Sequence, residues 1–380
     1  MSLLPCPHPE PPDWQVDWPA ITREFDWIRR MQGCPQDPVH HAEGDVWTHV
    51  GMVCRAMAGL DAWRALPESN RALLFAAALL HDVSKPECTR HENGRITSRG
   101  HSHRGAVRAR GILWEHGANL LQREEVAALI SHHQAPFYLI DRPDAQRMAY
   151  LISQAVHCDL LALLATTDAL GRQCEDQVGI LTRVELFREF CLEYQCLNGP
   201  SAFPSTLSRF EYFRHEGRDP GYLAHDKSSC EVILMSGLPG AGKDTWVATH
   251  AAHLPCISLD ELRQQMGAAP SGHQGAVIQA AKEGARTHLR QRQGFVWNAT
   301  NLSRDIRTQL VDLFTAYQAR VRLVYVEAPR ERLLKQNRER AKAVPLAALE
   351  HMLERWDVPG PTEAPLVEWW ENTGAWTRRA

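Results

Sequence analysis

A histidine followed directly by an aspartate ends an apolar stretch in the first half of the chain. The pair is His81-Asp82, and every residue from 73 to 80 is apolar. Two adjacent polar side chains at such a place both need polar partners, which a bound metal ion supplies. Imidazole and carboxylate ligands suit divalent transition metals, and two close metal ions can clamp a phosphate and activate a bridging water. The pair therefore indicates phosphoester hydrolysis. Further candidate ligands are dispersed over the same half: His49, His101, His103, His132, His133 and Asp168.

A glycine-rich segment in the second half has the composition of a phosphate-binding loop. A mostly apolar run, residues 231–236, leads directly into it. Glycines let backbone N–H groups wrap nucleotide phosphates, the following helix adds its positive end, and a lysine reaches the β- and γ-phosphates. The residue after the lysine is normally Ser or Thr, which binds Mg²⁺; here it is Asp244, with Thr245 next, so either is a candidate. The segment predicts ATP or another nucleoside triphosphate with Mg²⁺, bound through Gly237, Gly240, Ala241, Gly242, Lys243, Asp244 and Thr245.

A carboxylate follows the next apolar run after this loop. Asp260 stands after residues 256–259, and Arg263 comes three residues later. A kinase that phosphorylates a hydroxyl needs a carboxylate to accept its proton, and an arginine on the same helix face can hold a phosphate. Capping of a helix is the structural alternative for Asp260. A third apolar run ends in polar residues 297–301, which either face the same site or are solvated turn residues.

The last part of this half is locally basic. Residues 286–342 contain 13 Lys or Arg and 5 Asp or Glu, although the whole chain has a formal net charge of -3. Within this region, residues 330–340 have the pattern of a basic helix that can close over ATP. Arg338 and Arg340 in that helix are candidates for neutralising charge on the transferred phosphoryl group, with a solvated helix face as the alternative.

The elements that position these residues divide the chain in two. Apolar residues recur at helical spacing in 71–80, 126–130 and 160–170, which predicts a helical first half. Residues 198–229 are rich in Gly, Pro and Ser with scattered aromatic residues, a composition that predicts a linker. Apolar runs at 231–236, 256–259, 295–299 and 321–327 then predict the strands of a parallel βαβ sheet. The predicted parts are 1–197, 198–229 and 230–380.

Composition excludes several classes of protein. With 380 residues, 44% hydrophobic and 23% charged, the chain has the size and balance of two globular domains. Its 10 cysteines form no C-x-x-C pair, so we expect reduced thiols. The longest apolar run is too short for a membrane span and no signal pattern stands at the start, so we expect a cytoplasmic protein.

The first half resembles the HD superfamily, whose order is His, His-Asp, further His and then Asp. The segments around His81-Asp82, residues 100–106 and residues 167–172 carry the resemblance. It implies an all-α HD-type domain with His49, His81, Asp82 and Asp168 on a first metal and His101 with His133 on a second. His103, His132 and Asp159 remain alternatives to His101, His133 and Asp168. Lys85 is implied as a phosphate ligand, with a solvated surface lysine as the alternative, and Mn²⁺, Fe²⁺, Co²⁺ and Ni²⁺ are all compatible with the site.

The second half, over residues 230–360, resembles the kinase domain of end-healing polynucleotide kinases. The resemblance rests on the P-loop, the Ser258-Leu-Asp260-Glu-Leu-Arg263 element, the polar Thr300-Asn301 element and the basic helix. It implies an α/β P-loop kinase with Asp260 as base and Arg263 on the phosphate next to the accepting nucleotide.

The tandem order resembles the bifunctional bacterial HD-domain polynucleotide kinases. This implies a nucleic-acid end-healing enzyme that phosphorylates 5′-hydroxyl ends of RNA or DNA and removes a 2′-phosphate, with 2′,3′-cyclic or 3′-phosphate ends as further substrates. A ligase is the implied functional partner. The alternative is a kinase of small molecules or nucleotides fused to a nucleotide phosphohydrolase, and a third class is a nucleotide-dependent regulatory module.

Overall fold

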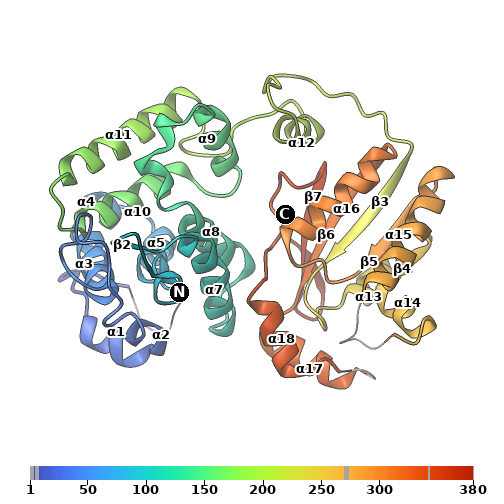
Figure 1. Cartoon of the computed structure of the whole chain (residues 1–380), viewed down its shortest axis with the longest axis horizontal. Helices are drawn as coiled ribbons and strands as arrows, with labels where there is room; N and C mark the ends of the chain where they lie inside the picture. Colours follow the sequence, from blue (N-terminus) through green and yellow to red (C-terminus); the bar gives the residue numbers. More distant parts are fainter. Residues whose placement is uncertain (1–3, 5–7, 269–273, 341–342, 380) are drawn as a thin grey trace. The chain divides into compact units, whose positions relative to one another are not determined.

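The structure, a computed structural model, describes residue 4 and residues 8–268, 274–340 and 343–379. The chain divides into two compact units, Met1–Ser201 and Ala202–Ala380 (Figure 1). The division falls inside the segment that the sequence predicts to be a linker.

The first unit consists mainly of helices, coloured blue to green in Figure 1. Its α-helices are α1 (Trp18–Glu24), α2 (Asp26–Arg29), α3 (Val46–Gly59), α4 (Asp61–Arg64), α5 (Glu68–Leu80), α6 (Lys85–Cys88), α7 (His101–Glu115), α8 (Leu120–His132), α9 (Ala145–Ser153), α10 (Cys158–Leu170) and α11 (Gln177–Glu193). Two 3₁₀ turns, η1 (Ala135–Phe137) and η2 (Leu139–Asp141), follow α8. The predicted helical character is confirmed.

Helix α5 lies at the centre of this unit and is buried on all sides over its last turns. Every side chain from residue 72 to residue 80 is buried, and α5 packs against α3, α8 and α10. The neighbouring helices have polar N-caps: Asp45 accepts a hydrogen bond from the Thr48 N–H, and Asn119 accepts one from the Gln122 N–H. Burial of α5 fixes the position of the residues that follow it.

The first unit also contains a β-hairpin that the predicted all-α fold lacks. Strands β1 (Arg90–Glu92) and β2 (Arg95–Thr97) pair antiparallel around Asn93 and Gly94. Both turn residues have positive φ angles, 52° and 74°, which is the geometry of the Asn-Gly hairpin turn. The strands are short, polar and largely exposed, so they have no apolar alternation that reveals them, but the Asn-Gly pair is a usable signal.

The second unit is an α/β fold. Its strands are β3 (Cys230–Ser236), β4 (Cys256–Ser258), β5 (Phe295–Asn298), β6 (Ala319–Glu327), β7 (Leu366–Asn372) and β8 (Trp376–Arg378). Its helices are α12 (Thr206–Arg214), α13 (Lys243–His250), α14 (Leu259–Gln265), α15 (Gly275–Arg290), α16 (Arg304–Ala316), α17 (Arg330–Glu339) and α18 (Leu346–Leu353). The four predicted strands are present, with ends that differ by one or two residues.

The six strands form one sheet in the order β4-β5-β3-β6-β7-β8. All neighbouring pairs are parallel except β7 and β8, which run antiparallel. The carboxyl ends of the five parallel strands therefore meet at one edge of the sheet. The segments that follow β3, β4, β5 and β6 carry the predicted kinase residues, so this edge is where ligands of an open α/β sheet bind.

The tryptophan-rich end of the chain belongs to this sheet, as strands β7 and β8. Strand β7 buries Glu368, whose carboxylate accepts two hydrogen bonds of 3.0 Å from Arg322 on the neighbouring strand β6. A buried charged residue interrupts the apolar–polar alternation by which a strand is recognised. The arginine that pairs with Glu368 is 46 residues away in the sequence.

Part of the predicted linker also folds. Helix α12 lies in it, and Phe210 on α12 is buried in the hydrophobic core of the second unit. Among the described residues, no single helix is long and apolar enough to cross a bilayer. Helices α9 and α10 reach that length and composition only when taken together, and they are bent by 104°.

Candidate metal centre and phosphate-binding site

Five helices of the first unit bring the predicted metal ligands together. The set comprises His49 on α3, His81 and Asp82 at the end of α5, His101 at the start of α7, His133 after α8 and Asp168 on α10. All six side chains are buried. Residues that span more than a hundred positions of the sequence thus share one site in the core.

Asp82 lies at the middle of this cluster. One of its oxygens, Oδ2, is 3.3 Å from His81 Nε2 and 3.8 Å from His49 Nε2. Its other oxygen, Oδ1, is 3.3 Å from His101 Nε2, which is 3.4 Å from His133 Nε2. The described residues thus form two ligand groups that share Asp82, namely His49–His81–Asp82 and Asp82–His101–His133.

Backbone carbonyls set the orientation of three of the imidazoles. The Nδ1 atoms of His81, His101 and His133 lie 2.7–2.8 Å from the carbonyl oxygens of the residues three positions earlier. A neutral imidazole that donates through Nδ1 has its lone pair on Nε2, the form that binds a metal. Burial lowers the pKa of His133 to about 3 and also lowers the pKa of His101, so both rings are neutral at pH 7.

Unsatisfied polar atoms show that the cluster fits a divalent metal. The Nε2 atoms of His49 and His81 and both Asp82 oxygens are buried without a well-directed hydrogen bond. Such atoms are costly in a protein interior unless a metal ion or another polar partner meets them. Burial favours a raised pKa for Asp82, but His81 and Lys85 outweigh it and hold that pKa well below its usual range.

The alternative ligands lie in different surroundings. His103 is exposed, and His132 and Asp159 are only half-buried. Asp168 Oδ1, by contrast, is 3.2 Å from His49 Nε2. Both Asp168 oxygens also accept hydrogen bonds from Arg172, at 3.0 and 2.7 Å.

Lys85 is buried, so it is not a solvated surface lysine. Its Nζ is 2.7 Å from Asp82 Oδ2 and donates a 2.7 Å hydrogen bond to Gln36. The ammonium group therefore lies directly beside the ligand cluster, as a phosphate ligand requires.

The sequence reasoning missed a carboxylate behind the first ligand group. Glu43 Oε1 is 2.9 Å from His49 Nδ1 and 2.7 Å from His41 Nδ1, and Glu43 Oε2 accepts from the Gln173 N–H. Burial works to raise the pKa of Glu43, but these hydrogen bonds outweigh it and lower that pKa strongly. A carboxylate that receives the second N–H of a ligand histidine orients the ring and raises its basicity. Only the tertiary fold reveals this role, since Glu43 belongs to no motif.

In the second unit the glycine-rich loop connects β3 to α13. Gly237 has φ 142°, and a Cβ atom there would lie 2.2 Å from the Val326 carbonyl oxygen, so only glycine fits. Gly242, with φ 100°, precedes the first residue of α13. The loop therefore has the strand, turn and helix context of a P-loop.

Lys243 is folded back onto this loop. Its Nζ donates hydrogen bonds of 2.9 and 3.0 Å to the carbonyls of Gly237 and Leu238. Burial lowers its pKa to about 8, while Asp244 acts in the opposite direction. Asp244 and Thr245 are both exposed, and Asp244 Oδ1 accepts a 2.7 Å hydrogen bond from Asn298 at the end of β5.

Polar residues at and after the end of β5 contact the P-loop and the strand before it. Asn298 contacts Asp244, the Gly237 N–H donates to the Thr300 carbonyl, and the Asn301 side-chain amide donates to the Met235 carbonyl. These residues therefore make defined contacts with the P-loop and are not solvated turn residues.

Asp260 lies on α14 at the same edge of the sheet. Its Oδ1 forms an ion pair with Arg263, its Oδ2 is 3.6 Å from Arg340, and its side chain is 65% exposed. The cap of α14 is Ser258, whose side chain accepts from the Glu261 N–H, so Asp260 is not the helix cap. Arg340 follows α17 directly, whereas Arg338 is exposed on that helix. Lys342, the last residue of the basic region, lies outside the described residues.

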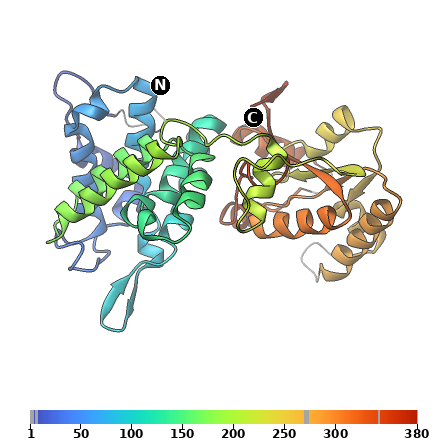
Figure 2. The same cartoon turned by 90° about the horizontal axis from the view of Figure 1, so that it is seen from above.

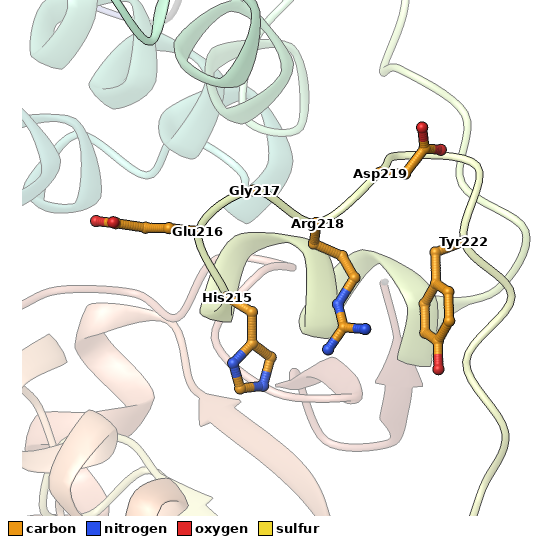
Figure 3. Close-up of a pocket in the computed structure, with 6 residues that line it drawn as sticks. All are labelled: His215, Glu216, Gly217, Arg218, Asp219 and Tyr222. Carbon is orange, nitrogen blue, oxygen red and sulfur yellow. The ribbon is translucent and has the colours of Figure 1, made fainter.

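A surface pocket of the second unit follows α12 (Figure 3). It is lined by His215, Glu216, Gly217, Arg218, Asp219 and Tyr222. The Arg218 guanidinium lies 4.5 Å from the centre of the Tyr222 ring. None of the predicted site residues lines this pocket.

Two family models match separate parts of the chain. One, described as an HD domain, matches residues 46–152, and the other, described as an AAA domain, matches residues 232–359. The first range holds the described ligand cluster except Asp168, and the second holds the P-loop, Asp260 and Arg340.

A curated relative and two solved structures are similar to part of the chain. L-seryl-tRNA(Sec) kinase of Methanococcus maripaludis is 21% identical over 136 residues, 34% of this chain and 53% of the relative. The chain thus spans about half the length of that relative. A Chloroflexus aurantiacus protein, described only provisionally as a kinase, is 21% identical with a TM-score of 0.33 over 39% of this chain and 87% of that one. A sugar kinase of a Janibacter species is 16% identical with a TM-score of 0.30 over 37% and 85%.

The two matched domains imply different cofactors. A P-loop kinase domain implies ATP with Mg²⁺. An HD domain implies a divalent metal, which the His and Asp groups of the first unit suit. The chain combines an N-terminal HD domain with a C-terminal P-loop domain of the kinase type.

Proposed function

We propose that this chain repairs the ends of nucleic acids. The second unit transfers the γ-phosphoryl group of ATP to a 5′-hydroxyl end of RNA or DNA. The first unit removes a 2′-phosphate, with 2′,3′-cyclic and 3′-phosphate ends as further substrates. The products have the ends that a ligase joins, so a ligase is the functional partner.

The observation that carries the kinase proposal is the exposed Asp260 carboxylate with the partly exposed Arg263 and Arg340 beside it. A carboxylate next to a P-loop suits a hydroxyl acceptor, and the Arg263 guanidinium paired with it suits an acceptor that itself carries a phosphate. The side chain of Asp260 is 65% exposed, so a large acceptor can reach it. The relative whose name denotes a seryl-tRNA substrate is a further support for an acceptor carried on RNA.

Each kinase residue has one role in this proposal. Asp260 accepts the proton of the attacking 5′-hydroxyl, and Arg263 exchanges Asp260 for the phosphate next to that hydroxyl. Lys243 leaves the loop carbonyls for the β- and γ-phosphates, and Arg338 and Arg340 neutralise charge on the transferred group.

In the first unit the Nε2 atoms and carboxylate oxygens of the cluster hold one or two divalent metal ions. A bound metal ion supplies a Lewis acid for the phosphate and lowers the pKa of a bound water. Glu43 keeps the ring of His49 in its ligand orientation, and Lys85 turns from Asp82 to a phosphate oxygen of the substrate. The ligands proposed are His49, His81, Asp82, His101, His133 and Asp168.

Acceptor competition tests the kinase part. We expect the chain with ATP and Mg²⁺ to phosphorylate a 5′-hydroxyl oligonucleotide far faster than nucleosides or sugars, and Asp260→Asn to lower the rate about 100-fold or more without loss of ATP binding. Glu261→Gln, one residue further along α14, is the control. Preference for small acceptors would favour a metabolite kinase joined to a nucleotide phosphohydrolase. An unaffected Asp260→Asn variant would remove this residue from the reaction.

A further inference from the structure

The β1–β2 hairpin is the one element of the described first unit that extends beyond the helices, and Figure 2 shows it in cyan. All residues from Arg90 to Arg95 are exposed. The hairpin buries no apolar core of its own, so its conformation depends on the Asn-Gly turn and on contacts at its base. The hairpin therefore contributes little to the stability of the unit, and its exposed side chains indicate its role.

Both ends of the hairpin are tied to the candidate metal centre. The Thr89 hydroxyl donates a 2.8 Å hydrogen bond to the carbonyl of Lys85 and lies 2.8 Å from the Ser98 hydroxyl. The Ser98 carbonyl is 2.7 Å from Nδ1 of His101, a member of the ligand cluster. The base of the hairpin therefore adjoins the residues proposed to bind the substrate phosphate and the metal.

The hairpin and the start of α7 present positive charge. Residues 89–104 contain four arginines and one acidic residue, Glu92. The side chain of Arg99 is 86% exposed, and its ion pair with Glu92 is long, at 3.9 Å. Arg90 donates only to the neighbouring carbonyl of Thr89 in the described contacts. Arg95 differs, because Asp37 accepts a 3.2 Å hydrogen bond from it.

We propose that this hairpin binds the sugar-phosphate backbone of a polynucleotide whose phosphorylated end lies at the metal centre. The inference rests on the proposed function and adds to it a substrate class for the first unit: strands of several nucleotides in preference to mononucleotides. Two three-residue strands reach about 10 Å from their base, which is the length of about three nucleotides of a stacked strand. Guanidinium groups bind backbone phosphates without reading the sequence. Arg90 and Arg99 are the contacts with the fewest competing partners.

The test compares a long and a short substrate on the full chain. The variant Arg90→Ala with Arg99→Ala is assayed on a single-stranded RNA with a terminal 2′-phosphate and on adenosine 2′-monophosphate. We expect kcat/KM for the RNA to fall about 10-fold at 50 mM salt, and the log–log salt slope to become shallower by about 1.4, the value for two phosphate contacts. Hydrolysis of the mononucleotide stays within about twofold, since it does not reach the hairpin.

Two further variants separate charge from structure. Arg90→Lys with Arg99→Lys keeps both charges and should retain most of the RNA activity. The control Arg142→Ala with Arg188→Ala also removes two arginines with partly exposed side chains from the first unit and should have no selective effect. Equal losses on both substrates would mean that the hairpin has only a structural role, and an unchanged RNA rate would overturn the proposal.

A binding measurement keeps the hairpin proposal separate from the repair function. Fluorescence anisotropy with the same RNA in EDTA needs no turnover. One outcome is that the chain with Arg90→Ala and Arg99→Ala binds this RNA more weakly while the wild type hydrolyses no 2′-phosphate. That result would support RNA binding by the hairpin and reject the phosphatase function. Binding that these two substitutions leave unchanged would reject the hairpin proposal whatever the activity.

Discussion

At the scale of single residues, each candidate site depends on a side chain that must change its partners when a ligand binds. Asp82 has two buried oxygens without well-directed hydrogen bonds, and Lys243 is bonded to the carbonyls of its own loop. Each residue is therefore arranged for an exchange of partners. Asp82 would exchange Lys85 for a metal ion, and Lys243 would exchange carbonyls for phosphate oxygens.

Replacement of Asp82 tests its position between the two ligand groups. We expect Asp82→Ala to weaken Mn²⁺ binding at least about 100-fold and to abolish phosphatase activity, because both groups lose a shared ligand. Kinase activity should stay within about twofold. Isothermal titration with Mn²⁺ checks binding, with Asp159→Ala as the matched control on α10. Unchanged Mn²⁺ affinity would exclude Asp82 as a ligand.

The lowered pKa of Lys243 predicts proton uptake when ATP binds. A lysine with a pKa of about 8 is half neutral at pH 8, and phosphate oxygens favour its charged form, so binding takes up about half a proton there. At pH 6.5 the lysine is already charged and uptake vanishes. Titration calorimetry in two buffers of different ionisation enthalpy measures this number. Lys243→Arg should show no uptake, and equal uptake by that variant would assign the proton to another group.

At the scale of elements, a buried ion-pair network joins α7 to α8. Glu124 on α8 accepts hydrogen bonds of 2.9 Å from Arg110 on α7. Arg123 donates a further 2.9 Å hydrogen bond to the same carboxylate. Helix α7 begins at His101 and α8 ends one residue before His133, so the network holds the second ligand group in place.

The pKa of Glu124 predicts how the stability of this pair depends on pH. Burial acts to raise that pKa, but Arg110 and Arg123 outweigh it and the net pKa is lowered from 4.5. The stabilisation is therefore complete above about pH 4.5 and lost as pH falls through the folded-state pKa. Glu124→Gln should cost about 3 kcal/mol at pH 7 and progressively less below pH 4.5. Urea unfolding at several pH values checks this, with exposed Glu185→Gln as control; a cost independent of pH would contradict it.

The elements also show how far the sequence alone could lead. The P-loop and His81-Asp82 are contiguous, so their surroundings could be predicted from the adjacent apolar runs. Contacts such as Glu43 with His49 or Asn298 with Asp244 join distant segments through the tertiary fold, and no local pattern indicates them. Strand β7 was missed for a similar reason, because its buried Glu368 is compatible with a strand only beside Arg322.

At the scale of the whole molecule, the chain divides into two compact units, and each holds one of the two candidate sites described above. The metal cluster lies entirely in the first unit, and the P-loop with Asp260 and Arg340 lies entirely in the second. Because no candidate residue is shared, we predict two activities that can be removed one at a time.

The separation of the two activities can be tested on a single RNA that carries a 5′-hydroxyl and a 2′-phosphate. With ATP, Mg²⁺ and Mn²⁺, the wild type should add the 5′-phosphate and remove the 2′-phosphate. His81→Ala should lose only the second change, and Lys243→Ala only the first. If neither end of the RNA changes while the protein still hydrolyses free nucleotides or phosphorylates small molecules, nucleic-acid repair is not its function.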